Sequence, residues 1–384
     1  MKVLIATSTG ATRNSMEICH GIGKDQRLDL SVVLPDKVAV EKVYDPTGWL
    51  LVEQEQKGEE FLLIPVSLKD PRNPRKGFKW GHLLRVIRET GPEIIHVWEE
   101  PLSYRLFQFT WIRTLARSRA KVIFYGFQNV SFRWKWLQRI IWKLTWNHVS
   151  GGAMASSEAV ENLRRLGFPH GGRLEHIFYG VPTNLFYPMD KRELKKELAI
   201  NCRFVVGYVG RLVPEKGLDW LLEAVELLSP DVHCLVLGDG PMGAALEKRS
   251  SAPGLRDRVH FLGAKTASEV PKWMNCFDVL AVPSLTRVGW KEQYGRVIAE
   301  AMACGVPVVG SDSGAIPEVL DSCGLVVPEG NVEKLAEALH SAIHDEETRA
   351  RLIQGGLRRV KEELSVHVMS QRLVEFYERI LFIL

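Results

Sequence analysis

The sequence predicts an α/β protein with two parallel sheets, and three observations support this prediction. Short apolar runs alternate with helical patterns along the chain, which is typical of parallel sheets covered by helices on both faces. The length of 384 residues suits two or three domains. A composition of 46% hydrophobic and 25% charged residues is ordinary for a globular protein. The sequence contains no internal repeat and no low-complexity segment.

The first half of the chain opens as a Rossmann-like layer does. Residues 2–6, KVLIA, predict a buried strand, and a small polar loop and a helical pattern through Gly23 follow it. The loop, STGATRNS, lacks the G-x-G-x-x-G pattern, and no acidic residue follows a second strand at the expected distance, which argues against a dinucleotide site. Further strands are predicted at 30–34, 61–66, 94–98, 121–125 and 152–155.

The second half repeats the alternation of strand, glycine-bearing loop and helix. Strands are predicted at 203–209, at the start of 232–241, at the start of 258–266, and at 279–282. The first of them runs into VGRLVPEKGL, which spans 209–218. Asp239 lies in a Gly-Asp-Gly-Pro turn, whose turn chemistry explains it without a metal ion. Beyond residue 331 the patterns are those of amphipathic helices.

The stretch from Asp278 to Leu320 carries the strongest functional signal. Glu292 lies just before a predicted helix and Glu300 lies inside it, so the two are at most about 12 Å apart along the helix axis. That distance matches a nucleoside diphosphate with a sugar attached. At a helix N-terminus the backbone N–H groups of residues 294–297 would suit a phosphate. Taken alone the glutamate pair is weak evidence, because many amphipathic helices carry two exposed glutamates eight residues apart.

Three segments together resemble a known family. The Glu292-x7-Glu300 spacing, the segment AMACGVPVVGSDSGAIPEVL after it and VGRLVPEKGL at 209–218 resemble glycosyltransferase family 4, which comprises retaining enzymes of the GT-B fold. The resemblance is strong from Phe204 to about Val327 and loose before that. It implies two Rossmann-like domains that face each other across a cleft, with the C-terminal helix crossing back to the first domain.

The same resemblance implies the domain limits. LEHIFYGVPTNLFYP at 174–188 is similar to the family's passage between domains, although Pro182 replaces the usual Asp. We therefore expect an acceptor-binding domain at 1–185, a nucleotide-sugar-binding domain at 186–365, and a C-terminal helix at 366–384 that packs on the first domain.

The resemblance also assigns roles on the donor side. Arg211 and Lys216 would face the diphosphate and stabilise the departing oxygen electrostatically, unless they serve only in surface salt bridges. Glu292 would bind hydroxyls of the donor sugar, and Glu300 would bind the ribose diol. Glu292 is not expected to be a nucleophile, because the sequence supplies no carboxylate pair about 5 Å apart at the anomeric carbon. The other donor-binding candidates are Gly10, Gly210, Gly263, Tyr294, Gly295, Arg296 and Val297.

The acceptor side is expected at the carboxyl ends of two strands of the first domain. His96, Glu99 and Glu100 end the strand at 94–98, where open α/β sheets bind ligands, although a lone histidine in a strand is more often a packed core residue. Gln128 and Asn129 end the next strand, where many family members have a histidine that touches the donor sugar. Both can bind a hydroxyl, but neither carries a proton at neutral pH.

Composition limits the remaining possibilities. A net charge of +4 is far from that of a dedicated nucleic-acid binder. Six scattered cysteines without a C-x-x-C pair predict free thiols in a reducing compartment and no zinc site. No Asp-x-Asp occurs, so we expect no metal and no cofactor beyond the nucleotide-sugar substrate. No run of 18 apolar residues occurs, and the expected location is the cytoplasm, in solution or at the inner face of the membrane.

Residues 131–148, SFRWKWLQRIIWKLTWNH, combine tryptophans with basic residues in one predicted helix. Membrane contact and an ordinary core helix with a basic outer face both remain open. Trp134, Leu137, Ile141 and Leu144 recur at helical spacing and would face the sheet, which leaves Trp136 and Trp142 for lipid.

The function that the sequence supports is transfer of a sugar from a UDP- or GDP-sugar to a hydroxyl of a glycan, lipid-linked or small-molecule acceptor, with retention of configuration. Two alternatives stay open. One is a GT-B phosphorylase or epimerase, and the other is a catalytically silent subunit that only binds a partner.

Overall fold

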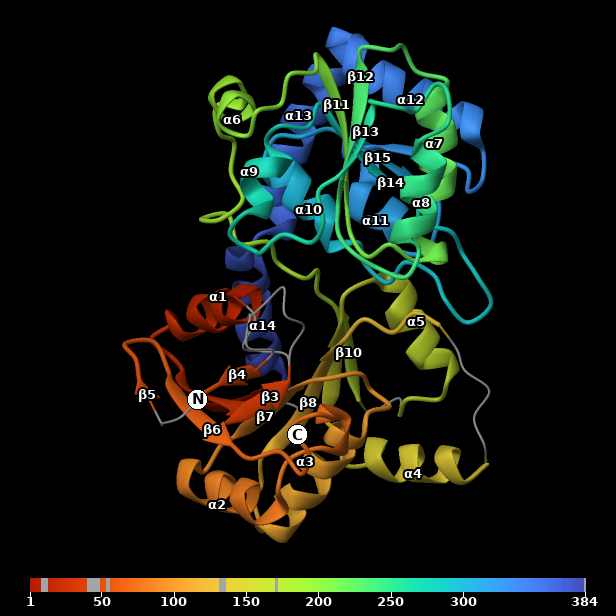
Figure 1. Cartoon of the computed structure of the whole chain (residues 1–384). Helices are drawn as coiled ribbons and strands as arrows, with labels where there is room; N and C mark the ends of the chain where they lie inside the picture. The colour runs from red at the N-terminus through yellow and green to blue at the C-terminus, as the bar shows by residue number, and fades with distance from the viewer. Residues whose placement is uncertain (8–12, 40–48, 53–55, 131–135, 170–171, 383–384) are drawn as a thin grey trace. The chain divides into compact units, whose positions relative to one another are not determined.

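The computed structural model describes residues 1–7, 13–39, 49–52, 56–130, 136–169 and 172–382 (Figure 1). The contacts divide the chain into two compact units. Unit 1 comprises Met1–Gly180 together with Val366–Leu384, and unit 2 comprises Val181–Ser365. The expected boundary after residue 185 lies five residues beyond this division, and the expected second boundary at 365/366 coincides with it.

Unit 1 contains an eight-stranded sheet in the order β10-β9-β8-β7-β1-β2-β6-β5. All pairs are parallel except β5–β6 at the edge. A separate antiparallel pair joins β3 (Lys37–Ala39) to β4 (Trp49–Leu51). The strands of the main sheet are β1 (Lys2–Thr7), β2 (Asp29–Pro35), β5 (Gln56–Lys57), β6 (Leu62–Val66), β7 (Ile94–Trp98), β8 (Lys121–Gly126), β9 (Gly151–Met154) and β10 (Arg173–His176).

Helices connect these strands, as the alternation predicts. The helices of unit 1 are α1 (Arg13–Gly23), the 3-10 turn η1 (Pro74–Lys76), α2 (Trp80–Thr90), α3 (Tyr104–Leu115), α4 (Trp136–Trp146), α5 (Ser157–Arg165) and α14 (Val366–Leu381). Among the described residues, no helix is both long and apolar enough to cross a bilayer.

Unit 2 contains a six-stranded, fully parallel sheet in the order β13-β12-β11-β14-β15-β16. Its strands are β11 (Phe204–Val209), β12 (Val232–Leu237), β13 (Val259–Phe261), β14 (Val279–Val282), β15 (Val308–Ser311) and β16 (Leu325–Val327). Since β11 to β13 extend the sheet in one direction and β14 to β16 in the other, the strand order reverses between β11 and β14. Open α/β sheets bind ligands at the carboxyl ends of the strands at such a switch point.

Helices cover both faces of the second sheet, with α9 and α10 on one side and α7 and α8 on the other (Figure 1). The helical elements are α6 (Lys191–Glu197), the 3-10 turn η2 (Pro214–Lys216), α7 (Leu218–Glu226), α8 (Gly243–Ser250), α9 (Val270–Met274), α10 (Arg296–Ala303), α11 (Ile316–Leu320), η3 (Asp321–Cys323), α12 (Val332–His344), α13 (Glu346–Arg359) and a π-helical turn at Val360–Leu364.

The C-terminal helix α14 returns to unit 1 and packs on α1, which confirms the expected crossing. The approach is close, because a Cβ on Gly21 would lie 2.4 Å from the Ser370 hydroxyl oxygen. A buried polar contact adds to the packing: the Tyr377 hydroxyl lies 2.8 Å from Nδ1 of His96 in the central strand β7. The end of the chain is therefore part of the core of unit 1.

The face of α4 that meets the core differs from the expectation. Ile141 and Leu144, expected to face the sheet, are exposed, whereas Trp142, expected to face lipid, packs against the core of unit 1. Trp146 is buried and donates its indole N–H to the Pro101 carbonyl over 3.0 Å. The helix carries two apolar stripes, and the one that contains the i, i+4 pair of tryptophans contacts the core. Trp134, the first residue of the expected stripe, lies outside the described residues.

Candidate active site

The candidate site lies at the switch point of the unit 2 sheet, at the carboxyl ends of β11 and β14. The loop after β11 carries Arg211 and continues into η2, which ends at Lys216. The loop after β14 carries Glu292 and leads into α10. The sheet topology therefore brings together residues that are 76 positions apart in the sequence.

Lys216 and Glu292 form an ion pair at this point. The Lys216 ammonium donates to Oε2 of Glu292 over 2.5 Å, and the Ser284 hydroxyl donates to the same oxygen over 2.8 Å. The Glu292 side chain is only 9% exposed and that of Lys216 is 21% exposed. The ammonium also lies 5.3 Å from the centroid of the Trp290 ring, which is a cation–π distance. An enclosed carboxylate needs such partners, because an unpaired buried charge is strongly unfavourable.

The loop after β15 fixes the backbone of Glu292. Ala315 N–H donates to the Glu292 carbonyl over 3.0 Å. Gly314, with φ of 55°, lies so close that a Cβ there would be 2.1 Å from the same carbonyl oxygen. Only glycine combines this conformation with this approach.

A second close approach sets the position of Lys216. Gly217 has φ of 68°, and a Cβ on it would lie within 1.9 Å of the Pro283 carbonyl oxygen at the end of β14. The Leu285 N–H donates to the Glu215 carbonyl over 2.8 Å. The loop after β11 is thus fastened to the loop after β14 on both sides of the lysine.

Arg211 lies in the same loop with an exposed side chain. Its carbonyl accepts a hydrogen bond of 2.8 Å from the buried Tyr208 hydroxyl, which fixes the backbone beneath the guanidinium. Burial and the nearby charge of Glu292 raise the pKa of Tyr208. Tyr208 therefore stays protonated and can keep donating this bond.

Glu300 lies inside α10, after a helix start capped by Gly295 with φ of 73°. Burial raises the pKa of the Glu300 carboxyl, and the charge of Arg296 partly offsets this. Glu292 precedes the helix, Gly295 is its cap, Arg296 and Val297 open its first turn, and Glu300 follows, whereas Tyr294 lies before the cap. The first N–H groups of a helix have no partner within that helix and carry partial positive charge, as an anion requires.

The remaining glycine loops of unit 2 meet at the same edge of the sheet. Gly238 N–H donates to the Gly263 carbonyl over 3.0 Å, and Gly210 N–H donates to the Leu237 carbonyl over 2.9 Å. Gly263, the expected nucleobase contact, has φ of 67° and open space around its Cβ position. Among the described residues no group of three His, Cys, Asp or Glu side chains is arranged to hold a metal ion. Asp239 instead accepts the Gly240 N–H over 2.6 Å, as its turn predicts.

The acceptor-side candidates in unit 1 have different surroundings. His96 is fully buried and bonded to Tyr377, and burial lowers its pKa to about 3. Its ring has no exposed surface that an acceptor could contact. His96 is therefore a packed core residue and not an acceptor-binding one. Glu99 forms an enclosed ion pair of 2.5 Å with Arg105. Gly10 lies outside the described residues.

The neighbouring Glu100 lies where the carboxyl ends of β7 and β8 meet. Its Oε2 accepts the Gln128 N–H over 3.0 Å and the Phe127 N–H over 3.2 Å, which joins the carboxyl ends of β7 and β8. Burial raises the pKa of Glu100 to about 7, partly offset by these two bonds. Gln128 and Asn129 are both buried, and the Asn129 amide donates to Glu158 over 3.1 Å. The position of Glu100 at a strand end was a sequence signal for it.

Ser284 and Gly314 were not among the predicted site residues. Both act through the position of Glu292, one through its carboxylate and the other through its backbone. The sequence signal was the small-residue segment GSDSG at 310–314, but its contact with the loop after β14 depends on the pairing of β14 with β15.

Two Rossmann-like units, one with a cation–carboxylate pair at its switch point, define the GT-B class of fold. The crystal structure of Anabaena HepE in complex with UDP and glucose has this fold and superposes with a TM-score of 0.74, covering 99% of this chain and 100% of that one at 19% identity. Residues 190–359 match the family model described as Glycosyl transferases group 1. The match falls within unit 2 and contains every donor-side candidate except Gly10.

Two curated proteins are similar over part of the chain. A GDP-mannose-dependent monoacylated alpha-(1-6)-phosphatidylinositol monomannoside mannosyltransferase of Corynebacterium glutamicum is 34% identical over 53% of this chain and 56% of its own length. The lipopolysaccharide core biosynthesis mannosyltransferase LpsB of Rhizobium meliloti is 29% identical over 53% of this chain and 60% of its own length. The chain thus spans somewhat more than half the length of these two relatives.

The contact between Gly314 and Glu292 can be tested by substitution. Gly314→Ala should lower stability and weaken nucleotide binding, because its Cβ collides with the Glu292 backbone. Gly330→Ala is a matched control, since Gly330 also has a positive φ, of 73°, but no atom within 4 Å of its Cβ position. The control should lose only the backbone strain, about 1–2 kcal/mol. Equal losses of melting temperature and of UDP or GDP affinity in both variants would contradict the assignment.

Proposed function

We propose that this chain is a glycosyltransferase that moves a hexose from a UDP- or GDP-sugar to a hydroxyl, with retention of configuration. The observation that carries the proposal is the Lys216–Glu292 pair at the switch point of a Glycosyl transferases group 1 domain. The cation would serve the diphosphate, and the carboxylate would serve the sugar attached to it. Enclosure strengthens both interactions, because the surrounding dielectric is low.

The proposed reaction breaks the bond between the anomeric carbon and the diphosphate oxygen. Arg211, Lys216 and the N-terminal turn of α10 stabilise the negative charge that develops on that oxygen. The acceptor oxygen bonds to the anomeric carbon on the same face, and its proton passes to the departing phosphate. Glu292 orients the sugar through its hydroxyls, and Glu300 holds the ribose diol.

Glu292 neutralises Lys216 and holds it in place. We propose that a bound diphosphate shares this ammonium, which leaves Glu292 able to accept hydrogen bonds from the sugar. The ion pair would then link the two halves of the donor. Removal of Lys216 should weaken binding of the diphosphate, and removal of Glu292 should weaken the orientation of the sugar.

For the acceptor, we propose that unit 1 supplies Glu99, Glu100, Gln128 and Asn129 at the carboxyl ends of β7 and β8. The names of the two curated relatives refer to a phosphatidylinositol mannoside and to the lipopolysaccharide core. We therefore propose a lipid-linked or glycan acceptor rather than a free small molecule. Six free cysteines support a reducing compartment, and we propose the cytoplasm, at the inner face of the membrane.

Fluorescence titration with UDP, GDP and ADP is the first test, because Trp290 lies against Lys216 and should report occupancy. Tight binding of one of the first two, followed by release of that nucleotide from a matching nucleotide sugar, supports a transferase. Turnover that requires free phosphate would indicate a phosphorylase, and isomerised donor would indicate an epimerase. Failure to bind any of the three would leave a silent subunit as the better description.

Arg211→Ala should reduce transfer on the order of a hundredfold or more, the usual effect of removing one electrostatic stabiliser. Its exposed side chain predicts an unchanged melting temperature. The matched control is Lys248→Ala on the exposed surface of α8, with no expected change in turnover. Lys216→Ala should lose activity as well, but it also leaves Glu292 enclosed without its cation, so a lower melting temperature is expected. Near-normal turnover in Arg211→Ala would refute the diphosphate assignment.

Substitutions of Glu292 and Glu300 should have different effects on ligand binding. Glu300→Gln should weaken free UDP or GDP by tenfold or more, the effect of losing a charge-assisted hydrogen bond of roughly 1.5–3 kcal/mol. Glu292→Gln should leave free-nucleotide affinity nearly unchanged and reduce discrimination among donor sugars. Calorimetric titration with the nucleotide and with the intact nucleotide sugar measures both. The same loss of free-nucleotide affinity in the two variants would reject this division of roles.

Activity should persist in excess chelator, since Arg211 and Lys216 already supply two positive charges for the diphosphate. The assay compares release of nucleotide with and without EDTA after extensive dialysis. Loss of activity that magnesium or manganese restores would assign a metal-binding role to Asp239 or Asp312.

A further inference from the structure

An apolar face on unit 1 is not used by the proposed reaction. Aromatic side chains continue along α3: Tyr104 stacks on Phe107 at 5.9 Å, Phe107 lies 5.9 Å from Trp111, and Trp111 lies 5.7 Å from His148, just after α4. Helices α3 and α4 are in contact. We call the outer surface of these two helices the α3–α4 face.

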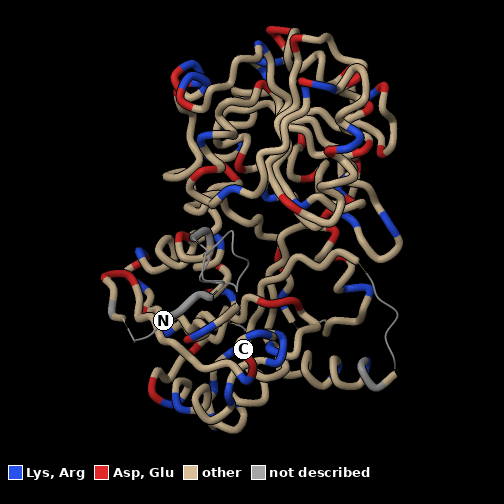
Figure 2. The backbone as a smooth tube through the Cα atoms, in the orientation of Figure 1, with Lys and Arg blue, Asp and Glu red and all other residues tan. Residues whose placement is uncertain are grey.

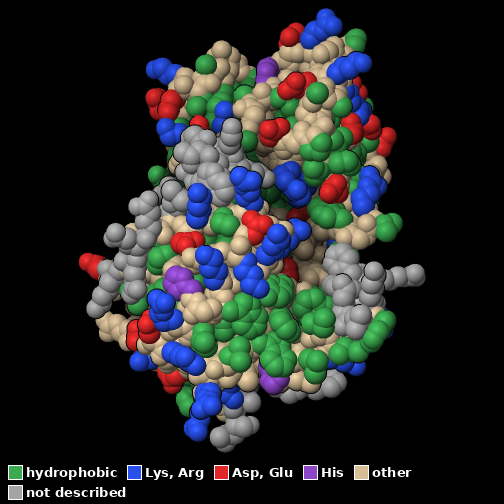
Figure 3. Space-filling view, turned by 60° about the horizontal axis from the view of Figure 1, so that its bottom comes forward, with side chains coloured by type: hydrophobic (Ala, Val, Ile, Leu, Met, Phe, Trp, Pro, Cys, Tyr) green, Lys and Arg blue, Asp and Glu red, His purple; other side chains and the backbone are tan. Residues whose placement is uncertain are grey.

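Exposed hydrophobic side chains concentrate on this face. Six of the eleven large hydrophobic side chains exposed among the described residues belong to α3 and α4, and they are 36% to 68% exposed. They are Tyr104, Leu115, Trp136, Ile140, Ile141 and Leu144. Figure 3 shows hydrophobic side chains gathered over this part of the unit, with Lys and Arg beside them. Single exposed hydrophobics are ordinary, but a contiguous patch marks an interaction surface.

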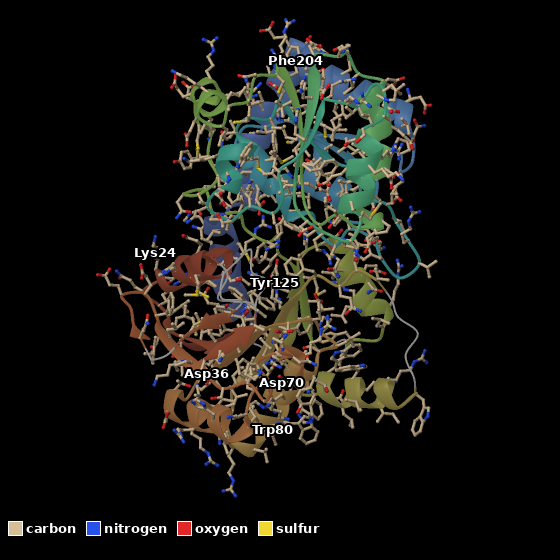
Figure 4. All side chains as sticks on the ribbon, in the orientation of Figure 1. Lys24, Asp36, Asp70, Trp80, Tyr125 and Phe204 are labelled. Carbon is tan, nitrogen blue, oxygen red and sulfur yellow. The ribbon has the colours of Figure 1, made fainter. Side chains whose placement is uncertain are left out.

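The part of the sequence that contains this face is strongly basic. Residues 67–148, which include α2 and two strands besides α3 and α4, contain sixteen Lys and Arg against five Asp and Glu, a net charge of +11 in a chain whose total is +4. One of these cations, Arg105 of α3, is buried and paired with Glu99, so the exposed cations belong to α4 and to the surroundings of the face. Lys69 lies 5.2 Å from the Tyr104 ring and 5.8 Å from the Trp80 ring, at the edge of the aromatic row. Asp70 and Trp80 lie in the same part of unit 1 (Figure 4), and basic residues recur around α2 and α3 (Figure 2). On α4, Arg139 and Lys143 are exposed beside the apolar side chains.

The positive charge around the α3–α4 face indicates which kind of partner it binds. A second copy of the chain seated symmetrically on this face would bring two strongly basic surfaces together, which is unfavourable. An anionic lipid surface is complementary instead: its headgroups attract the cations, and its interface accepts tryptophan, tyrosine and aliphatic side chains. The packing of α4 fits this role, because Trp142 and Trp146 hold the helix to the core while Trp136, Ile140, Ile141 and Leu144 stay outside.

We propose that the α3–α4 face binds an anionic membrane surface peripherally, with the outer side chains of α4 inserted at the headgroup level and the flanking cations on lipid phosphates. The proposal goes beyond the transfer reaction and does not depend on it, because it uses no residue of the donor site. Together with a membrane-associated acceptor, it would place the enzyme where its substrate is.

Flotation of the full-length chain with vesicles tests the proposal. The probes are phosphatidylcholine vesicles with and without 30% phosphatidylglycerol, at low and high salt. The protein should float with the anionic vesicles at low salt and bind much less at high salt, because salt screens the attraction. Absence from the floating fraction at low salt would overturn the proposal, as would equal binding to the neutral vesicles.

Charge reversal provides the matched comparison. Arg139→Glu combined with Lys143→Glu should weaken binding by about 25-fold or more, since each cation near the surface contributes roughly fivefold. Arg192→Glu combined with Lys196→Glu on α6 is the control, because these residues are also exposed cations four positions apart on a helix. Equal losses in the two double variants would mean that only the net charge matters, which contradicts a specific face.

A further double variant tests how much the apolar side chains of α4 contribute to vesicle binding. Ile140→Gln with Leu144→Gln keeps the charge and good helix formers, and it should reduce vesicle binding several-fold while UDP or GDP affinity and melting temperature stay unchanged. Unchanged vesicle binding would reject insertion of α4. A dimer in solution that this variant dissociates, in a protein that does not float with vesicles, would assign the face to a second copy and overturn the membrane proposal. Unchanged nucleotide affinity also keeps this test separate from that of the proposed function.

Discussion

The candidate site depends on one constraint, which is that the enclosed carboxylate of Glu292 must keep its cationic partner. Lys216, Ser284 and the backbone after β15 all converge on this residue. A charge this enclosed is stable only when its partners are fixed in advance. Two close backbone approaches, at Gly217 and Gly314, provide that fixation. A mobile loop could present the same side chains, but it could not hold them at one distance.

This arrangement follows from the strand order. Because β11 and β14 are neighbours at the point where the strand order reverses, the loops that follow them lie next to each other at the carboxyl end of the sheet. Lys216 comes from the loop after β11 and Glu292 from the loop after β14. The N-terminal turn of α10 adds backbone donors without any further side chain. An anion and a hydroxyl-rich group can therefore be bound next to each other, which is the requirement for a nucleotide sugar.

The tryptophans of unit 1 occupy two kinds of position, in the core and at the surface. Trp146 and Trp142 secure α4 to the core, and the Trp98 indole N–H donates to His96 over 3.2 Å beside Tyr377 of α14. Trp136 is exposed on the opposite side of α4. The local excess of tryptophan between residues 80 and 146 thus reflects both a core built partly from indole rings and an outer surface suited to a membrane interface.

Periodicity was sufficient for strands such as β7 and β14, which begin and end where the apolar runs predict, but the short strands β3, β4, β5, β10, β15 and β16 were not predicted. The candidate donor-side residues came from the family resemblance, and the structure places them at strand ends and near a helix start. Three features required the tertiary structure: the pairing of Lys216 with Glu292, the burial of His96 under α14, and the outward face of α4. The first two join residues 76 and 281 positions apart, and no local pattern reports such contacts. For α4 the sequence contains two apolar stripes, and only the packing of Trp142 and Trp146 against the sheet decides which of them faces inward.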